Sequence, residues 1–294
     1  MRIGIVGSDN THALGFAEVA NLDRFTGADV SVVAICGDDP SATRQVAKRG
    51  RIPDVLSGPD EMAGRVDAAI IVNRDGAVHR SNAAPFLRAG LPVLVDKPLA
   101  ATLADAQAIL AQAHEHAALV TSYSSLRWCA DTRELGASLS DVGSPVLIEV
   151  SGLCDFASPY SGHFFYGIHE VEIALALHPT APTVVRADPS GAVRTVTIQT
   201  ADRCVVALNL IGATDGVLPQ VPFAAACYAP GGRVGRTIKN EPDLSTALDI
   251  FLAMVASGEP PLTDEQLLTP IAVLEAIGES ARTGGVPVEL PATL

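Results

Sequence analysis

The residue best suited to proton transfer in this sequence is Lys97, which ends an apolar run and directly precedes Pro98. A lysine at the end of a core strand would enter a crevice, where a low dielectric lowers the pKa of an ammonium group. A lowered pKa suits lysine to general acid and base chemistry. The alternative is a solvated lysine at a strand end, and residue spacing alone does not decide between the two.

A second candidate lies in the opening residues, MRIGIVGSDNTHALGF. An apolar strand followed by a glycine turn and a helix begins a dinucleotide-binding domain, in which the motif G-x-G-x-x-G approaches the diphosphate. Gly7 stands at the first glycine position, but Asp9 and His12 occupy the second and third. The sequence therefore raises the question of whether this turn still binds a dinucleotide.

Asp9 is the main obstacle to such binding. Two like charges ~4 Å apart at an effective dielectric of about 20 repel by roughly 4 kcal/mol, which corresponds to about a thousandfold loss of affinity. Two arrangements would avoid this repulsion. Either Asp9, Asn10 or Thr11 caps the helix with the charge turned away, or His12 and nearby backbone amides bind a phosphate oxygen. If neither holds, the stretch is a capped turn that binds nothing.

The elements around these residues alternate between short apolar runs and helical patterns from Arg2 to about Ser124. The runs are almost continuously apolar, as in parallel strands covered on both faces. Gly50 and Gly90 give C-cap signals for two of the helices. The pattern predicts a doubly wound, Rossmann-type α/β domain over residues 1–124. Its expected strands are residues 2–7, 29–36, 67–73, 92–97 and 118–123.

The pattern changes after a helical connector at about residues 127–139. Strands now follow one another, and apolar helices occur at residues 167–177 and in two segments near the end of the chain. This order predicts an α+β domain over residues 125–294, with a mostly antiparallel open sheet and helices on one face. Its expected strands are residues 144–153, 192–200, 203–212 and 223–229.

Several motifs in order make the chain resemble the glucose-fructose oxidoreductase and inositol dehydrogenase (Gfo/Idh/MocA) family. V-D-K-P-L-A at residues 95–100 resembles the E-K-P motif, and residues 79–93 resemble the run H-x-x-x-A-x-x-A-L-x-A-G-K-x-V. Val33-Ala34-Ile35 before Asp39-Pro40 resembles the second strand and its turn. The stretches L-D-I-F-L-A-M-V-A-S-G-E-P-P and E-S-A-R-T-G-G-V-P-V resemble the closing helices.

The resemblance implies roles for residues in both domains. Lys97 would lie beside the nicotinamide and polarise the carbonyl or alkoxide oxygen. His169, in Y-G-I-H-E-V-E, resembles the histidine of D-x-G-x-H-x-x-D and would be the general acid and base. Phe165 replaces the aspartate of that motif, Glu172 stands at its later acidic position, and Tyr166 is the candidate second donor. Without the resemblance, the same stretch is compatible with core aromatics and a histidine at a helix start.

The strand ends and the resemblance together define the candidate binding residues. Arg127, before Trp128, resembles an arginine that faces the family's active site, although a helix-surface arginine is an equal alternative. The catalytic candidates are Lys97, His169 and Tyr166. The cofactor-binding candidates are Gly7, Ser8, Asp9, Asn10, Thr11, His12, Gly37, Asp38, Asn73, His79, Asp96 and Lys97. The substrate-binding candidates are Lys97, Arg127, Tyr166, His169 and His163.

The choice of cofactor depends on the end of the second strand. Gly37 stands at the usual position of the ribose-binding acid, and Asp38 and Asp39 follow it. Carboxylates there accept a hydrogen bond from a ribose 2′-hydroxyl and repel a 2′-phosphate, and no arginine stands beside them. NAD is therefore favoured over NADP.

Metal and disulfide sites are not expected. His163 and His169 with Glu170 and Glu172 include metal-ligating residue types, but H-x5-H is not a recognised ligand pattern. The five cysteines are odd in number, widely spaced and without a C-x-x-C pair, which favours free thiols in a reducing compartment.

The composition narrows the partners. With 20 Lys and Arg against 33 Asp and Glu, the formal charge is −13, and no basic block is present. Nucleic acid and anionic membranes are therefore not expected as partners. No signal peptide or spanning apolar run is evident, so the predicted location is the cytoplasm. The resemblance implies a homodimer or homotetramer, formed through the open face of the second domain's sheet.

Together these features predict an oxidoreductase that moves a hydride between a nicotinamide cofactor and a secondary alcohol or carbonyl of a sugar, polyol or related small molecule. Asp9, His12 and Phe165 leave open a non-redox or regulatory sugar-binding protein on the same scaffold. A lyase or isomerase that retains NAD and reoxidises it in each turnover is a third possibility.

Overall fold

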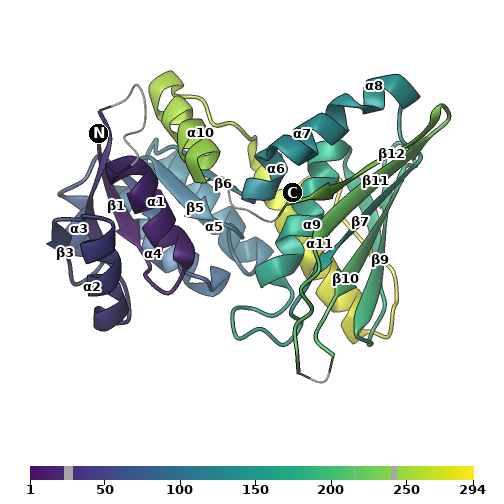
Figure 1. Cartoon of the computed structure of the whole chain (residues 1–294), viewed down its shortest axis with the longest axis horizontal. Helices are drawn as coiled ribbons and strands as arrows, with labels where there is room; N and C mark the ends of the chain where they lie inside the picture. The colour runs from purple at the N-terminus through teal and green to yellow at the C-terminus, as the bar shows by residue number, and fades with distance from the viewer. Residues whose placement is uncertain (23–28, 215, 240–243) are drawn as a thin grey trace. The chain divides into compact units, whose positions relative to one another are not determined.

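The chain forms two compact units in the computed structural model, which describes residues 1–22, 29–214, 216–239 and 244–294 (Figure 1). Unit 1 consists of Met1–Tyr123 and Asp243–Leu267, and unit 2 consists of Ser124–Pro242 and Leu268–Leu294. Each unit has its own sheet. The division of the sequence at residue 124 stays a prediction, and by its contacts the later segment 243–267 packs with unit 1.

Unit 1 contains a six-stranded sheet in the order β3-β2-β1-β4-β5-β6, and every strand pair in it is parallel. The strand order reverses between β1 and β4, as in a doubly wound Rossmann fold, so the predicted fold class is confirmed. The short β3 was not predicted, because its two exposed residues form no apolar run. The strands are β1 (Arg2–Val6), β2 (Ser31–Cys36), β3 (Asp54–Val55), β4 (Ala68–Ile71), β5 (Val93–Asp96) and β6 (Val120–Tyr123).

Helices α1, α2 and α5 of unit 1 begin at polar side chains that accept hydrogen bonds from first-turn amides. Asn10, Asp39 and Thr102 act in this way for α1, α2 and α5. Isoleucines of β1, β2 and β4 are fully buried and form the core of the sheet. The helices are α1 (Thr11–Asn21), α2 (Pro40–Arg49), α3 (Pro59–Ala63), α4 (His79–Arg88), α5 (Leu103–Glu115) and α10 (Leu244–Ser257), with a 3₁₀ turn at Gly76–Val78.

Helix α10 comes late in the sequence but packs within unit 1. The hydroxyl of Tyr123, at the end of β6, donates to the carbonyl of Ala247 at 2.7 Å. A Cβ on Gly15 of α1 would lie 2.3 Å from Cδ1 of Leu244, so the two helices approach each other closely at this glycine. Unit 1 is therefore completed by residues far from its other elements in sequence.

Unit 2 contains a seven-stranded sheet in the order β12-β11-β7-β10-β9-β8-β13. Strands β7 and β10 are parallel, and the other neighbours are antiparallel, as predicted for a mostly antiparallel sheet. Strands β8, β12 and β13 were not predicted, since they lie toward the sheet edges and carry few buried residues. The strands are β7 (Leu147–Leu153), β8 (Pro182–Ala187), β9 (Val193–Thr200), β10 (Val205–Ile211), β11 (Phe223–Ala229), β12 (Gly232–Ile238) and β13 (Val288–Glu289).

One face of this sheet is covered by α9 (Phe164–Leu177), which contacts β7, β10 and β11, and by the later part of α11 (Asp264–Arg282) (Figure 1). Alternate residues of β7 and β10 are buried against these helices, and the residues between them are only partly covered. Three shorter helices precede the sheet, namely α6 (Ser125–Trp128), α7 (Ala130–Ala137) and α8 (Leu139–Val142).

Helix α9 begins three residues earlier than the predicted helix, so His169 lies in its second turn and not at its start. All five cysteines are buried and have free thiols. Among the described helices, none combines the length and apolarity that crossing a bilayer requires.

Candidate functional site

The glycine turn after β1 keeps the geometry that its first glycine provides. Gly7 has φ +104°, and a Cβ there would lie only 2.7 Å from the backbone nitrogen of Asn73. Its own amide donates to the carbonyl of Cys36 at 2.9 Å. The turn is thus held against the ends of β2 and β4, and no other residue fits at this position.

The side chain of Asp9 is directed to a backbone amide. Its Oδ2 accepts a hydrogen bond from the backbone nitrogen of Arg74 at 3.2 Å. Asn10 is the N-cap of α1, with Oδ1 accepting from the His12 amide at 3.1 Å, and Thr11 is the first helical residue. Of the three capping candidates, Asn10 therefore caps the helix, while the Asp9 carboxylate is held by the residue after β4.

His12 forms a buried pair with Asp96 at the end of β5. The Nδ1–Oδ2 distance is 2.8 Å, and Asn10 also donates from Nδ2 to the same oxygen at 3.2 Å. Burial by itself would raise the pKa of Asp96, but the charge and hydrogen bond of His12, with the charges of Lys97 and His79, lower it to about 2. The pair joins the first turn of α1 to the strand that carries Lys97.

Lys97 is buried, with only 6% of its surface exposed. Burial lowers its pKa, Asp96 opposes this shift, and the charge of Arg74 lowers the pKa further. The structure thus contradicts the alternative of a solvated lysine at a strand end. A buried ammonium with a lowered pKa is the environment expected for a lysine that exchanges protons.

His79 is fully buried behind the strand ends. Its Nδ1 lies 2.8 Å from the carbonyl of Pro98, and its Nε2 lies 2.8 Å from that of Asn73. Asn82 donates to the side-chain oxygen of Asn73 at 2.8 Å. His79 therefore connects the residues after β4 and β5. Both of its ring nitrogens contact carbonyl oxygens, and its direct contact with a cofactor stays a prediction.

Two exposed carboxylates, Asp38 and Asp39, follow the end of β2. The Ser8 hydroxyl contacts the Thr43 hydroxyl at 2.9 Å, and a Cβ on Gly37 would lie 2.3 Å from Ser8 Oγ. Gly37 is thus required by the buried Ser8 side chain. Asp39 is occupied as the N-cap of α2, which leaves Asp38 as the exposed candidate for a ribose hydroxyl.

In unit 2, His169 is buried and hydrogen-bonded to Ser124. Its Nδ1 lies 2.6 Å from Ser124 Oγ, which also accepts a hydrogen bond from the backbone nitrogen of Leu126 at 3.1 Å. The ring meets the Phe223 ring edge-on at a centroid distance of 5.4 Å, and the Tyr166 ring lies 6.3 Å away. The aromatic rings and the hydrogen bond restrict the orientation of the imidazole.

A second buried pair joins Arg127 of α6 to Glu172 of α9, three residues after His169. The Arg127 guanidinium donates to Oε2 of Glu172 at 2.6 Å, and the two side chains are 6% and 4% exposed. Burial raises the pKa of Glu172, and Arg127 opposes that shift. Arg127 is therefore not a surface residue, and its charge is balanced by the glutamate that resembles the family's later acidic position.

Glu170 is a buried carboxyl group with no hydrogen-bond partner for either oxygen among the described residues. It points toward Gly152, where a Cβ would lie 2.8 Å from Oε1, and toward the ring of Phe223. Burial raises the pKa of Glu170 well above its usual value. The group is therefore held in its protonated, neutral form, which is tolerated in an apolar environment.

The remaining candidates of unit 2 lie near the start of α9. His163 Nε2 lies 2.8 Å from the carbonyl of Leu274, and burial lowers the pKa of this histidine. Phe165, at the position of the family's aspartate, packs against Tyr166 at a centroid distance of 4.7 Å. Within the described ranges, no group of three or more His, Cys, Asp or Glu side chains is arranged to hold a metal ion.

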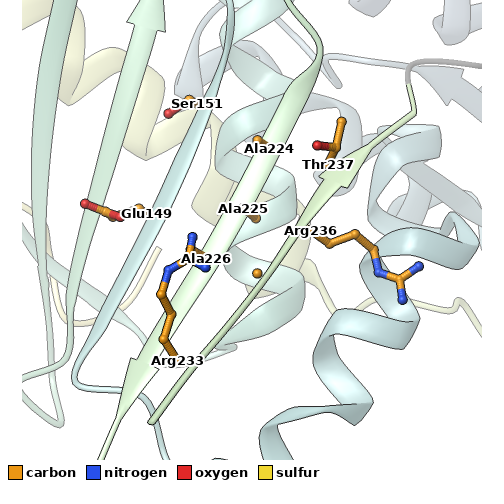
Figure 2. A pocket seen from close by; sticks show the side chains of 9 residues that line it. Glu149, Ser151, Ala224, Ala225, Ala226, Arg233, Arg236 and Thr237 are labelled. Carbon is orange, nitrogen blue, oxygen red and sulfur yellow. The ribbon is translucent and has the colours of Figure 1, made fainter.

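A separate groove of about 330 Å³ lies on the outer face of the unit 2 sheet. Figure 2 shows its small floor residues, including Ala224 and Ala226 of β11, between Glu149 of β7 and Arg233 of β12. The Tyr228 hydroxyl donates to Glu149 Oε2 at 2.8 Å. None of the predicted catalytic or binding residues lines this groove.

Ser124 is the residue that sequence reasoning missed. It lies 45 positions from His169, and no motif marks it. The available signal was indirect, because the replacement of the motif's aspartate by Phe165 leaves His169 in need of another partner.

The comparison with protein families agrees with the geometry of unit 1. Residues 1–124 match the model of the Gfo/Idh/MocA family, described as an oxidoreductase family with an NAD-binding Rossmann fold. Over these residues the chain is similar to the NAD-binding domain of that family. Inositol 2-dehydrogenase 1 of Saccharopolyspora erythraea is 33% identical over 173 residues, which are 56% of this chain and 48% of that protein. The match therefore spans about half the length of this relative.

Solved structures superpose over the whole chain. A probable dehydrogenase from Thermotoga maritima has a TM-score of 0.84 at 17% identity, with 100% of both chains covered. A myo-inositol dehydrogenase from Lactobacillus casei, in complex with NAD(H) and myo-inositol, has a TM-score of 0.82 at 15% identity. It covers 100% of this chain and 98% of its own. At these identities the likeness shows a shared fold.

The buried carboxyl group predicts a pH-dependent effect of Glu170→Gln. The unfolded chain loses this proton at the usual carboxyl pKa, whereas the folded chain keeps it to higher pH, so this group reduces stability as the pH rises. Relative to the wild type, Glu170→Gln should therefore gain stability from pH 5 to pH 8, by at most about 1.4 kcal/mol per pH unit. Urea unfolding at several pH values measures the difference.

Glu289→Gln is the matched control for Glu170→Gln, because it removes an exposed glutamate from the same unit. It should leave the pH dependence of unfolding unchanged. Parallel stability curves for Glu170→Gln and the wild type would show that Glu170 does not retain its proton.

Proposed function

We propose that the chain is an NAD-dependent dehydrogenase that acts on a secondary alcohol or carbonyl of a sugar, polyol or related small molecule. The observation that carries this proposal is the buried Lys97 at the carboxyl end of β5, in a Gfo/Idh/MocA Rossmann unit. The nicotinamide, when bound, supplies the hydride acceptor or donor. Relatives named as inositol dehydrogenases support the choice of polyols as a substrate class.

The residues of unit 1 fit a dinucleotide. Gly7 permits close backbone approach, and the N-terminus of α1 follows at the position where such domains bind the diphosphate. The Asp9 carboxylate is hydrogen-bonded to the Arg74 amide. This bond supports an arrangement in which the charge of Asp9 is turned away from the ligand. Asp38 would accept a hydrogen bond from the ribose and repel a 2′-phosphate.

The residues of this chain divide the remaining tasks. Lys97 of unit 1 and His169 of unit 2 are the proposed catalytic residues, and Tyr166 is the candidate second donor. Arg127 is held by Glu172, so any contribution that it makes to substrate binding depends on that pair. His79 and Asn73 would position the strand ends without chemistry of their own.

The first test is a titration of the full chain with NADH and NADPH, followed by energy transfer from the single tryptophan, Trp128, and by calorimetry. NADH should bind in the micromolar range and at least about tenfold more tightly than NADPH, a difference of about 1.4 kcal/mol. Asp38→Ala should reduce the ratio of the two Kd values, because it removes the carboxylate that would repel a 2′-phosphate.

Asp141→Ala removes an exposed carboxylate from unit 2 and serves as the control for Asp38→Ala. Absence of binding at millimolar concentrations of both cofactors would contradict the proposal. It would favour the alternative of a non-redox, sugar-binding protein on this scaffold. Tightly retained cofactor without net NADH formation would instead indicate a lyase or isomerase.

Substitution of Lys97 or His169 should lower the rate of the reaction far more than it changes the affinity for the cofactor. Lys97→Ala and His169→Ala should each lower kcat with a responsive sugar or polyol by about 10²–10⁴-fold, the usual contribution of a group that transfers a proton or donates a hydrogen bond to a reacting oxygen. The Kd for NADH should change only a few-fold. The exposed Lys48→Ala and His114→Ala are the controls, and unchanged turnover in both active-site variants would refute the assignment.

We also propose that the outer face of the unit 2 sheet mediates self-association, as the family resemblance implies. The small residues of its groove, Ala224, Ala226 and Gly235, would allow close approach of a second copy. Ala226→Arg should therefore shift the chain toward monomer in sedimentation equilibrium. A wild type that is monomeric at about 100 μM would contradict the proposed interface. The predicted cytoplasmic location has no structural test.

A further inference from the structure

We propose that Ser124 holds His169 as the tautomer protonated at Nε2, so that His169 acts on a substrate oxygen as a neutral hydrogen-bond donor. The inference deepens the proposed function and rests on it, because it assigns His169 its task in that reaction.

The argument begins with the hydrogen bonds of Ser124. Its side chain is fully buried. The oxygen has two partners among the described residues, the backbone nitrogen of Leu126 at 3.1 Å and His169 Nδ1 at 2.6 Å. A backbone N–H can only donate, whereas the serine hydroxyl has one hydrogen to place. Nδ1 of His169 is the one group that can accept it.

The tautomer of His169 follows from this donation. An Nδ1 that accepts a hydrogen bond carries no proton, so in the neutral ring the proton is on Nε2. The opposite tautomer would leave the Ser124 hydroxyl hydrogen buried without an acceptor, which is unfavourable. Ser124 thus acts through His169 and is a positioning residue.

The acidic side chains of α9 near His169 agree with a neutral ring. The family's aspartate, which would favour an imidazolium, is replaced by Phe165. Glu172 is paired with Arg127 at 2.6 Å. Glu170 lies on the same helix but faces Gly152, and its raised pKa keeps it uncharged. The side chain that contacts Nδ1 is therefore a hydroxyl, which stabilises an imidazolium less than a carboxylate does.

In the proposed reaction His169 keeps its Nε2 proton and donates a hydrogen bond from it to the substrate oxygen.

The decisive experiment is ¹⁵N NMR of the histidine rings in the full chain. The two ring nitrogens of His169 differ in chemical shift according to which one carries the proton, and the spectrum of His169→Asn identifies them. The wild type should show a protonated Nε2 and an unprotonated Nδ1. A protonated Nδ1 in the neutral wild-type ring would overturn the proposal, whatever the variants do.

Three substitutions at Ser124 test the cause. Ser124→Thr keeps a hydroxyl that can donate and should retain the wild-type tautomer. Ser124→Asp can only accept and should move the proton to Nδ1, while Ser124→Ala should abolish the preference. An unchanged tautomer in Ser124→Ala or Ser124→Asp would contradict the role of Ser124. The wild-type spectrum alone decides if these variants do not fold.

The kcat values of the Ser124 variants provide a second measurement, which a purely structural role of Ser124 would not change. Ser124→Ala should lower kcat at least about tenfold, corresponding to about 1.4 kcal/mol, with an unchanged Kd for NADH, and Ser124→Thr should restore kcat to within a few-fold. Thr102→Ala, which removes the N-cap of α5 in unit 1, should leave kcat unchanged. Equal kcat values for Ser124→Ala and the wild type would refute the positioning role.

The two readouts separate the inference from the proposed function. If neither cofactor binds, the proposed function fails, and the NMR spectrum still reports whether Ser124 sets the tautomer. If NADH binds and turnover is measured but His169 is protonated at Nδ1 in the neutral ring, the inference alone fails.

Discussion

The buried pair between His12 and Asp96 fixes the geometry of the carboxyl edge of unit 1. It joins the first turn of α1 to the end of β5 at 2.8 Å, with both side chains largely shielded from water. Without His12, the buried Asp96 carboxylate would lose its hydrogen bond to the ring, and a buried charge left without a partner is strongly destabilising. The position of Lys97, which directly follows Asp96, depends on this constraint. The Asn10 cap depends on it as well, since its side chain donates to the same carboxylate.

The two histidines of interest have partners of opposite character. His12 meets the carboxylate of Asp96, whose pKa is lowered to about 2. His169 meets the hydroxyl of Ser124. A carboxylate can only accept a hydrogen bond from a ring nitrogen, whereas a hydroxyl can also donate one. The chain thus uses the same residue type for two purposes by changing one neighbouring group.

The sequence supported the fold more fully than the site. The apolar runs of β1, β2, β4, β5 and β6 are buried on both faces, so their pattern was visible without tertiary information. Edge strands such as β12 contain glycine and arginine and are held in place by pairing with a neighbour, which a local pattern does not reveal.

The side-chain pairs of the site were harder to foresee. His12 and Asp96 were each recognised as unusual or relevant, but 84 residues separate them, and only the packing of α1 against the sheet brings them together. The serine that contacts His169 has no motif of its own. Conversely, Gly7 was identified correctly as the turn residue, because the requirement for a positive φ is local.

The contribution of α10 to unit 1 limits how the protein can be divided. The family model ends at residue 124, yet the Tyr123 hydroxyl and the α1 surface at Gly15 are both covered by residues beyond 243. An excised fragment of residues 1–124 would expose that apolar surface to water and lose the acceptor of the Tyr123 hydroxyl. The Rossmann unit is therefore continuous in space but not in the gene. If recombination exchanged only the first 124 codons, the new residues 1–124 would still have to pack against an α10 that comes from the other parent gene.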